Sequence, residues 1–529
     1  MGIPSYYRTL IQRIPHAIQR KAPTSGSVTP NTLVVDMNCM IYHVLKEPTM
    51  MATPYPGELG KLTWEKKLQR EVCLYLTHIW KSAGSPQKTY IALDGVVPYA
   101  KIKQQRFRRF KGASESSGAG TEGQGVWGDA FGTPWDKNAI TPGTQFMASM
   151  ASSLRETGKS HAWIISDTDE PGEGEHKVLQ WLLRENKNAS LLKGPVIVYG
   201  LDADLILLCL IAGDNLGPEY PIYLLREAMA FGKLVRTEKE VDLCFFQIST
   251  LKESLQKQGQ WTKEQFYDYI FGMSFCGNDF LPTGLSLRIR DEGHSILLSG
   301  LQELWQTGLH LVIIESDCIK PNPHGLKNFA QWISRQEERL ILAMIRRKMT
   351  ARLGEDESEN LPLREQAERD LVDEIGQGQI VLRTDWESTY AKLALGEDSE
   401  EQRKTRVQDF WKGWCWILDY YQGHPVDLEW VYPAGYPPTW KDLVRFFELP
   451  TDSWETRVPL RPQEQLALVL PMSSWSLMLN TEFRSLPTKI PQFWPQGFHL
   501  ETFGKRFGWE CEPMIPMLTP GRLRYENSK

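Results

Sequence analysis

The sequence lacks several features that would place it in a familiar class of protein. Its eight cysteines are scattered, with no CxxC pair and no cysteine/histidine spacing typical of a zinc site. A disulfide scaffold is therefore excluded, and free thiols in a reducing compartment are expected. No uninterrupted apolar run is long enough to span a bilayer, and no secretory hydrophobic segment follows Met1, so we expect no membrane location.

An excess of positive charge is also missing, since the formal net charge is −5 over 529 residues. This argues against a chain that coats nucleic acid without specificity, but it leaves room for a local basic patch balanced by acidic groups. The sequence has no internal repeat. Its length is sufficient for two or more domains with substantial cores.

The clearest structural unit lies in residues 163–208. Two apolar, β-branched runs, Trp163–Ile165 and Val196–Tyr199, each end at a turn that carries carboxylates. They predict two strands. The helix predicted between them has apolar residues at helical spacing, namely Val178, Leu179, Leu182 and Leu183.

Two earlier segments repeat this pattern. An apolar strand at Leu33–Val35 ends at Asp36, and the strand in TYIALDG ends at Asp94. Strands that alternate with helices predict an α/β fold with a mostly parallel sheet flanked by helices. Ligand sites in such sheets lie at the carboxyl ends of the strands, so we expect these acids to meet there.

Many carboxylates fall near the predicted strand ends. They cannot share a small space unless a cation offsets their repulsion, and oxygen ligands without cysteine or histidine favour Mg²⁺ or Mn²⁺. The alternative is ordinary turns and an acidic helix N-terminus. Asp279, in a tight turn before Pro282, could likewise be a metal ligand or only a turn-forming residue. The other acids are Asp36, Asp94, Asp167, Asp169, Glu170, Glu173, Glu175, Asp202 and Asp204.

A basic segment, KIKQQRFRRFK, follows Asp94 directly. On a helix, one face would carry Lys101, Gln105, Arg108 and Arg109. Such a cationic, amide-bearing face suits a phosphate group, which arginine can bind with two hydrogen bonds. A solvated helix face and a nuclear localisation patch are the alternatives.

Composition also predicts the domain organisation. Residues 1–349 would form a first domain and residues 350–408, which are charged and polar, a helical linker. Residues 409–529 are dense in aromatic residues and would form a second region. Its tryptophans at 411, 414 and 416 are expected to be mostly core.

The motifs resemble those of the XRN-type 5′→3′ exoribonucleases, in the same order. The resemblance continues through a second conserved region and so covers nearly the whole chain. Its segments in the first part are MGIPSYYR, LVVDMN, IALDGVVPYAKIKQQRFRRF, ITPGTQFM, EPGEGEHK, YGLDADLI and FCGNDFLP. Those in the second part are WCWILDYYQGHP, WVYPAGYPP, RPQEQLALVLP and GWECEPMIPMLTPGRL.

The resemblance implies roles for particular residues. A 5′-monophosphate pocket would be formed by Lys101, Gln105, Arg108 and Arg109. A histidine of the family that stacks on the first base is replaced here by Tyr42, with His43 next to it, and the partner tryptophan would be Trp430. The metal ligands would be Asp36, Asp94, Glu173, Glu175, Asp202, Asp204 and Asp279.

The resemblance also implies a fold and an activity. The α/β domain would be similar to PIN and flap nucleases, and the mixed C-terminal region would close the active site. With two Mg²⁺ or Mn²⁺ ions, the protein would degrade single-stranded, 5′-monophosphorylated RNA processively to mononucleotides. We expect a monomer in the cytoplasm, with the nucleus as the alternative location.

The chain lacks the long extensions of other members, as expected for a compact, catalytic-core-only member of a kind known from large DNA viruses. The alternative functions are a flap-endonuclease-like DNA nuclease, and an inactive RNA-binding or structural protein that retains the fold.

Overall fold

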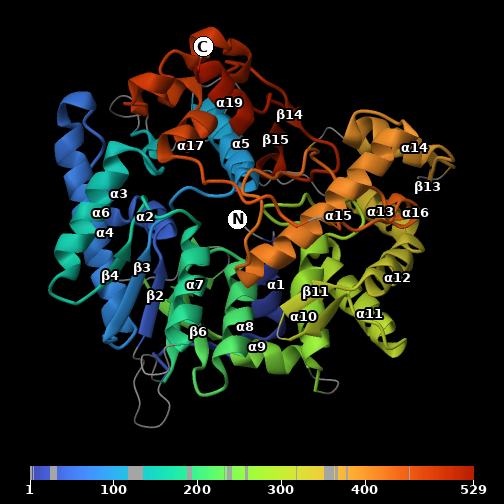
Figure 1. The fold of residues 1–529 in the computed structure, drawn as a ribbon, viewed down its shortest axis with the longest axis horizontal. Coiled ribbons are helices and arrows are strands. Elements are labelled where there is room, and N and C mark those ends of the chain that lie inside the picture. The colour runs from blue at the N-terminus through green and yellow to red at the C-terminus, as the bar shows by residue number, and fades with distance from the viewer. Residues whose placement is uncertain are drawn as a thin grey trace.

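A computed structural model of the chain provides the fold (Figure 1). It describes residues 3–528 apart from a set of short gaps. The gaps are residues 4, 24–31, 117–134, 188–193, 231–232, 235–240, 257–259, 317, 351–362, 364–366, 377–378 and 452.

A seven-stranded sheet with the order β1-β9-β6-β5-β2-β3-β4 forms the centre of the first half of the chain. Five neighbouring strands are parallel. At the β6 edge, β9 pairs antiparallel with β6, and β1 pairs antiparallel with β9. The predicted α/β fold with a mostly parallel sheet is therefore confirmed. The strands are β1 (Ile18–Gln19), β2 (Thr32–Asp36), β3 (Lys88–Ala92), β4 (Ile164–Ser166), β5 (Val196–Tyr199), β6 (Ile222–Glu227) and β9 (Leu243–Gln247).

Alternate residues of the parallel strands face two separate hydrophobic cores. Val34, Val196 and Val198 pack with the core on one face of the sheet, whereas Val35 and Ile197 pack with the core on the other face. This burial on both faces explains why the strands are continuous apolar runs. The helices of the first face are α7 (Gly174–Lys187) and α8 (Leu205–Leu216), and those of the second are α2 (Asn38–Val44), α4 (Lys61–Ser82) and α6 (Gln145–Gly158).

A helical layer extends the first core beyond the sheet (Figure 1). Its long helix α15 (Glu400–Gln422) carries Trp411, Trp414 and Trp416, which are at most 1% exposed, so the prediction that they are core residues is correct. The other helices are α1 (Tyr6–Arg13), α10 (Lys263–Gly272), α11 (Gly293–Gln306), α12 (Pro323–Ser334) and α16 (Trp440–Arg445). Helix α13 (Glu337–Met349) instead packs in a separate, smaller core that includes Trp386 and Tyr390.

The basic helix α5 (Tyr99–Ser116) packs against the C-terminal segment (Figure 1). That segment includes α17 (Pro462–Val469), β14 (Leu500–Glu501), β15 (Glu512–Pro513) and α19 (Pro520–Asn527). Apolar residues of α5 and of the C-terminal segment share one hydrophobic core. The position of α5 is therefore fixed by residues more than 300 positions later in the chain.

Part of the predicted linker, residues 350–408, also has a packed structure. It contains a strand pair, β12 (Val372–Glu374) and β13 (Ile380–Leu382), and a short helix α14 (Trp386–Tyr390), and the side chains of Ile380, Trp386 and Tyr390 are buried. Helix α15 crosses the expected boundary at 408–409. The three-part domain division remains a prediction.

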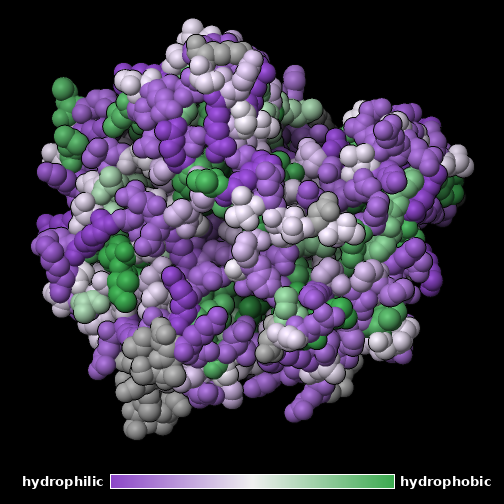
Figure 2. Space-filling model, in the orientation of Figure 1, coloured by the Kyte–Doolittle hydropathy of each residue, from purple (hydrophilic) through white to green (hydrophobic). Residues whose placement is uncertain are grey.

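The surface is mainly polar on the face shown in Figure 2, where hydrophobic residues occur in small separate groups. Among the residues that the structure describes, no helix has the length and apolar composition needed to cross a membrane. All eight cysteines are free.

Candidate functional site

The seven predicted acids meet beyond the carboxyl ends of the strands. Asp36 ends β2, and Asp94 lies in the loop after β3, two residues beyond the strand end. The pKa of Asp36 is raised by burial and by the charges of Asp94 and Asp202, so these carboxylates are close neighbours. Asp204 directly precedes α8. Burial and the charge of Asp279 raise the pKa of Asp204 to about 7.

The segment PGEGE, residues 171–175, shapes the start of α7. Gly172 has a φ of +115°, and α7 begins only at Gly174, so the segment is irregular up to that residue. The backbone N–H of Gly174 donates a hydrogen bond to Oδ1 of Asp94 at 2.7 Å. A Cβ atom at Gly174 would collide with the carboxylate of Asp36. Glycine therefore lets Asp36, Asp94 and α7 approach each other closely.

Three of the acids form a compact candidate metal site. Glu175, Asp202 and Asp204 each offer a carboxylate oxygen, and these oxygens lie within 4.8 Å of one another. Among the described residues, the buried oxygens Oε2 of Glu175 and Oδ1 of Asp204 have no hydrogen-bond partner. Unpaired buried carboxylate oxygens are costly, and a hard divalent cation would satisfy them. The donor set thus fits Mg²⁺ or Mn²⁺.

Lys101 lies among the other acids of the site. Its ammonium nitrogen is 2.5 Å from Oδ2 of Asp279 and 2.7 Å from Oε2 of Glu173. Although burial opposes the effect, Lys101 holds the pKa of Asp279 below its usual value. The amide of Gln104 also donates to Asp279. The first turns of α5 and the acidic cluster therefore form one continuous site.

Helix α5 uses its cationic side chains on two faces. Lys103, Arg106 and Lys111 donate hydrogen bonds to backbone carbonyls of the C-terminal part of the chain. On the predicted phosphate-binding face, Arg108 is exposed and Arg109 donates to the hydroxyl of Thr141.

Gln105, on that same face, accepts a hydrogen bond from Nε2 of Gln465 at 3.3 Å. Oε1 of Gln465 in turn accepts from the backbone N–H of Val97 at 2.9 Å. The side chain of Gln105 is thus held by α17.

The two neighbours Tyr42 and His43 point in different directions. His43 is buried, its Nε2 lies 2.8 Å from Oε1 of Glu47, and its ring packs 4.7 Å from that of Tyr75. Tyr42 is 40% exposed and interacts electrostatically with Arg109. Tyr42, not His43, therefore faces the side on which Arg109 lies.

Trp430 is 7% exposed, and its ring stacks on Trp416 with a centroid distance of 5.4 Å. Gly413 of α15 leaves room for the indole, because a Cβ atom there would lie 2.6 Å from its ring. In this structure Trp430 is thus held against α15.

Three further acids considered from the sequence have other partners. Asp167 forms an ion pair with Arg155, and Glu170 accepts a hydrogen bond from Ser166. Asp169 donates its backbone N–H to Asp167. They contribute to the turn after β4.

Sequence reasoning missed several side chains that support the site. They are Asn38, whose amide donates to Asp94 at 2.9 Å, Gln104, Thr141, Gln465 and Tyr420, whose hydroxyl donates to Glu173 at 3.0 Å. All five residues lie within motifs quoted above, but nothing in a single sequence pairs them with a particular partner in the site.

Two family models match the chain. The model described as the XRN 5′–3′ exonuclease N-terminus matches residues 1–228, and the model described as the Xrn1 helical domain matches residues 313–529. The chain belongs to the XRN family. The first match contains six of the seven acids and the basic helix α5, and the second contains α15 and the C-terminal segment.

Curated relatives of the XRN family are similar over 99% of this chain. A 5′-3′ exoribonuclease 2 of Arabidopsis thaliana is 26% identical, and the chain covers 66% of its length. A 5′-3′ exoribonuclease 2 of Gallus gallus is 23% identical, with 69% covered. A 5′-3′ exoribonuclease 1 of Saccharomyces cerevisiae is 24% identical, with 43% covered. The chain thus spans from less than half to about two thirds of these relatives.

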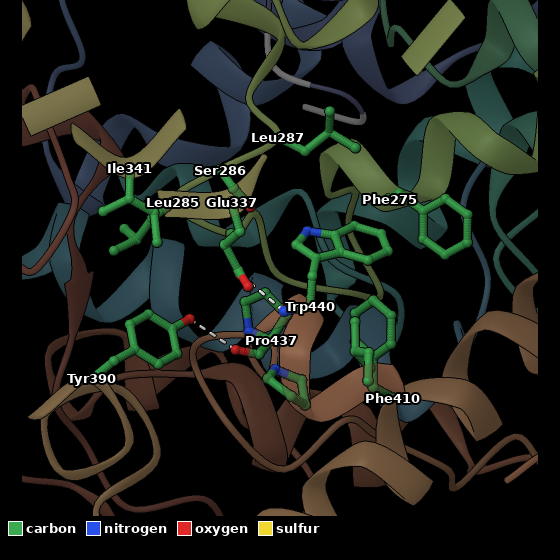
Figure 3. A pocket seen from close by; sticks show the side chains of 13 residues that line it. Phe275, Leu285, Ser286, Leu287, Glu337, Ile341, Tyr390, Phe410, Pro437 and Trp440 are labelled. Atoms are coloured by element: carbon green, nitrogen blue, oxygen red, sulfur yellow. Dashed lines mark hydrogen bonds between the residues drawn. The ribbon is translucent and has the colours of Figure 1, made fainter. Parts of the chain in front are cut away.

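A pocket away from the acidic cluster is lined mainly by apolar side chains (Figure 3). Within it, Oε1 of Glu337 accepts the backbone N–H of Trp440 at 2.9 Å, and the hydroxyl of Tyr390 donates to the carbonyl of Pro437 at 2.8 Å. Burial raises the pKa of Glu337 to about 8. These bonds join α13 and α14 to the segment around α16.

Proposed function

We propose that the chain is a divalent-metal-dependent 5′→3′ exoribonuclease that degrades 5′-monophosphorylated RNA processively to mononucleotides. The observation that carries the proposal is the contact of Lys101 with Glu173 and Asp279. It places a cationic helix face directly beside a cluster of buried carboxylates. If the helix face binds the 5′-phosphate of the substrate, the first phosphodiester bond is held at a fixed distance from that face, beside the carboxylates.

The acidic cluster would hold the metal ions. Glu175, Asp202 and Asp204 would bind one ion, and Asp36, Asp94, Glu173 and Asp279 would complete a site for two Mg²⁺ or Mn²⁺ ions. Bound there, such ions activate water and offset charge on the leaving oxygen. The protein's own contribution is to keep the carboxylates buried and oriented, through donors such as Asn38 and the N–H of Gly174.

The 5′-monophosphate would bind the face of α5 that carries Lys101, Gln105, Arg108 and Arg109. Arg108 is exposed and available for it, whereas Arg109 and Gln105 are held in place by Thr141 and Gln465. Charge-assisted hydrogen bonds from arginine favour a terminal phosphate over a hydroxyl. A capped or triphosphorylated end would be refused, because the pocket is suited to a single phosphate.

Tyr42 and Trp430 would enclose the first base. Base–aromatic stacking tolerates every base, so the stack can re-form after each nucleotide is released. The outward position of Tyr42 supports this assignment over His43. A tyrosine stacks without becoming cationic, unlike the histidine at this place in the family.

The substrate of the proposed enzyme is single-stranded RNA with a 5′-monophosphate. A monomer in the cytoplasm is also proposed, with the nucleus as the alternative compartment. The competing functions are a flap-endonuclease-like DNA nuclease and an inactive RNA-binding or structural protein.

One assay separates these functions. RNA and DNA single strands of the same sequence, each with a 5′-monophosphate, are incubated with the protein with and without Mg²⁺. The proposal predicts Mg²⁺-dependent loss of RNA with mononucleotide products. Faster cleavage of DNA would favour the flap-nuclease alternative, and binding of RNA without hydrolysis in Mg²⁺ or Mn²⁺ would favour the inactive protein.

A further inference from the structure

A row of four stacked aromatic rings ends at the acidic cluster, and two of the rings belong to helix α15. Trp416 and Tyr420, one helical turn apart, stack at 4.6 Å between ring centroids. Trp430 also stacks on Trp416, and His176 stacks on Tyr420 at 3.7 Å with an interplanar angle of 28°. Four rings thus connect Trp430 with the first turn of α7, where Glu175 lies.

Tyr420 also reaches an acid of the site directly. Its hydroxyl donates a hydrogen bond to Oε1 of Glu173 at 3.0 Å, and both side chains are buried. Lys101 contacts the other oxygen, Oε2. Each carboxylate oxygen accepts more than one hydrogen bond, so both contacts leave lone pairs for a metal ion. Together they fix the rotation of the Glu173 carboxylate.

The same ring contacts a second acidic segment. Phe280, which follows Asp279, packs at 5.5 Å from Tyr420 and 5.1 Å from Trp416. Tyr420 therefore touches both the start of α7 and the turn that carries Asp279. These two segments are more than 100 residues apart, and neither is part of the same element as Tyr420.

We propose that Tyr420 is a positioning residue for the metal site. Its hydroxyl holds Glu173, and its ring, which contacts both His176 and Phe280, keeps the α7 acids and Asp279 at a fixed separation. The metal site then depends on the second matched region of the chain, which carries α15. This inference rests on the proposed function, because it takes the acidic cluster as the metal site.

The test compares Tyr420→Phe with Tyr432→Phe. The first substitution keeps the ring and removes only the hydrogen bond to Glu173. The second removes a buried hydroxyl that donates to the carbonyl of Tyr436 at 3.0 Å, away from the acids. Mn²⁺ binding is measured by electron paramagnetic resonance without RNA, together with thermal unfolding and with kcat and KM on 5′-monophosphorylated RNA.

Tyr420→Phe is expected to bind Mn²⁺ about tenfold more weakly, since a hydrogen bond to a charged group contributes about that factor. Its kcat should fall at low Mn²⁺ and recover at high Mn²⁺, while KM for RNA stays unchanged. Tyr432→Phe should bind Mn²⁺ like the wild type. Unchanged Mn²⁺ binding by Tyr420→Phe, or an equal loss in both variants, would overturn the inference.

Glu173→Gln separates this inference from the proposed function. If Glu173→Gln binds Mn²⁺ as tightly as the wild type, Glu173 is not a ligand, and both the metal-site assignment and the role of Tyr420 are wrong. If Glu173→Gln binds weakly and Tyr420→Phe binds normally, only the role of Tyr420 is wrong.

Discussion

Lys101 of α5 contacts Asp279 across 2.5 Å, and this ion pair joins the basic helix to the acidic cluster. The two residues are 178 positions apart in the chain. Because both are buried, separating them would leave uncompensated charges, which is costly. The face of α5 that would bind phosphate and the acids that would bind metal are therefore fixed relative to each other.

The acidic cluster leads to a prediction about hydrolysis. Asp204→Ala and Glu175→Gln should each abolish RNA hydrolysis while RNA binding persists, because these carboxylates hold metal and do not contact the base stack. Turnover and RNA affinity are measured for each variant in Mg²⁺. If either variant keeps nearly wild-type turnover, the role assigned to that residue is wrong. Asp169→Asn, in the turn after β4, is a control that should retain activity.

End selection is predicted to depend on Arg108. Arg108→Ala should remove the preference for 5′-monophosphate over 5′-hydroxyl RNA more than it lowers general RNA affinity, since the exposed guanidinium is available to the terminal phosphate. The measurement is kcat/KM on the two RNAs, wild type beside variant. Equal losses on both RNAs would instead mean that α5 binds the backbone without specificity.

Base stacking is predicted to depend on the ring of Tyr42. Tyr42→Ala should slow single-turnover hydrolysis of all sequences, because stacking contributes about 1–3 kcal/mol per base. Tyr42→Phe should be nearly neutral, and Tyr42→His should stay active with a pH dependence near the imidazole pKa of about 6.5.

The competing assignment, stacking by His43, is tested beside it. His43 is buried against Tyr75, so His43→Ala should lower stability more than it changes the chemical step. A slow His43→Ala with normal folding, together with a normal Tyr42→Ala, would reverse the assignment.

Stability should depend on the opposite face of α5. The guanidinium of Arg106 donates to the carbonyls of Leu468, at 2.7 Å, and Phe493, and it lies over the ring of Phe110. Arg106→Met would leave buried carbonyls unpaired and should cost about 2–4 kcal/mol in the free energy of unfolding. The exposed Arg108 provides the control, since Arg108→Met should change the free energy of unfolding by less than about 0.5 kcal/mol. Both variants are measured by urea unfolding. An equal loss in the free energy of unfolding for Arg106→Met and Arg108→Met would contradict the division of α5 into a structural face and an exposed face.

Glu337 predicts a dependence of stability on pH. Burial raises its pKa to about 8 in the folded protein, above the ordinary value of 4.5. The folded state thus binds the proton of Glu337 more tightly than the unfolded state does. The contribution of this group to the free energy of unfolding is fully present below pH 4.5 and is lost as the pH rises through about 8. Between pH 6 and 9, the melting temperature of the wild type should fall more than that of Glu337→Gln. Parallel curves would show that Glu337 is not the cause.

The sequence predicts the sheet well because its strands are buried on both faces. Val196–Tyr199 was expected as a strand and is β5, and the expected strands at Leu33–Val35 and Trp163–Ile165 differ from β2 and β4 by one residue at their ends. Convergence of acids at the carboxyl edge follows from the topology of parallel sheets.

Contacts between distant segments were not predictable in the same way. Nothing in the spacing of KIKQQRFRRFK distinguishes Arg106, which binds backbone carbonyls of the C-terminal part of the chain, from Arg108, which is exposed. The hydrogen bond between Tyr420 and Glu173 depends on how α15 lies against α7, and helical periodicity does not specify that arrangement. The strand pair β12–β13 lies in a stretch whose charged composition suggested a solvated linker.

The most direct test of the central claim follows RNA labelled at its 3′ end, with either a 5′-monophosphate or a 5′-hydroxyl, in Mg²⁺. A processive enzyme that starts from a bound 5′-phosphate should convert the monophosphorylated RNA to mononucleotides without labelled intermediates, and should leave the 5′-hydroxyl RNA largely intact. Internal cleavage products, or equal rates on the two RNAs, would contradict the account.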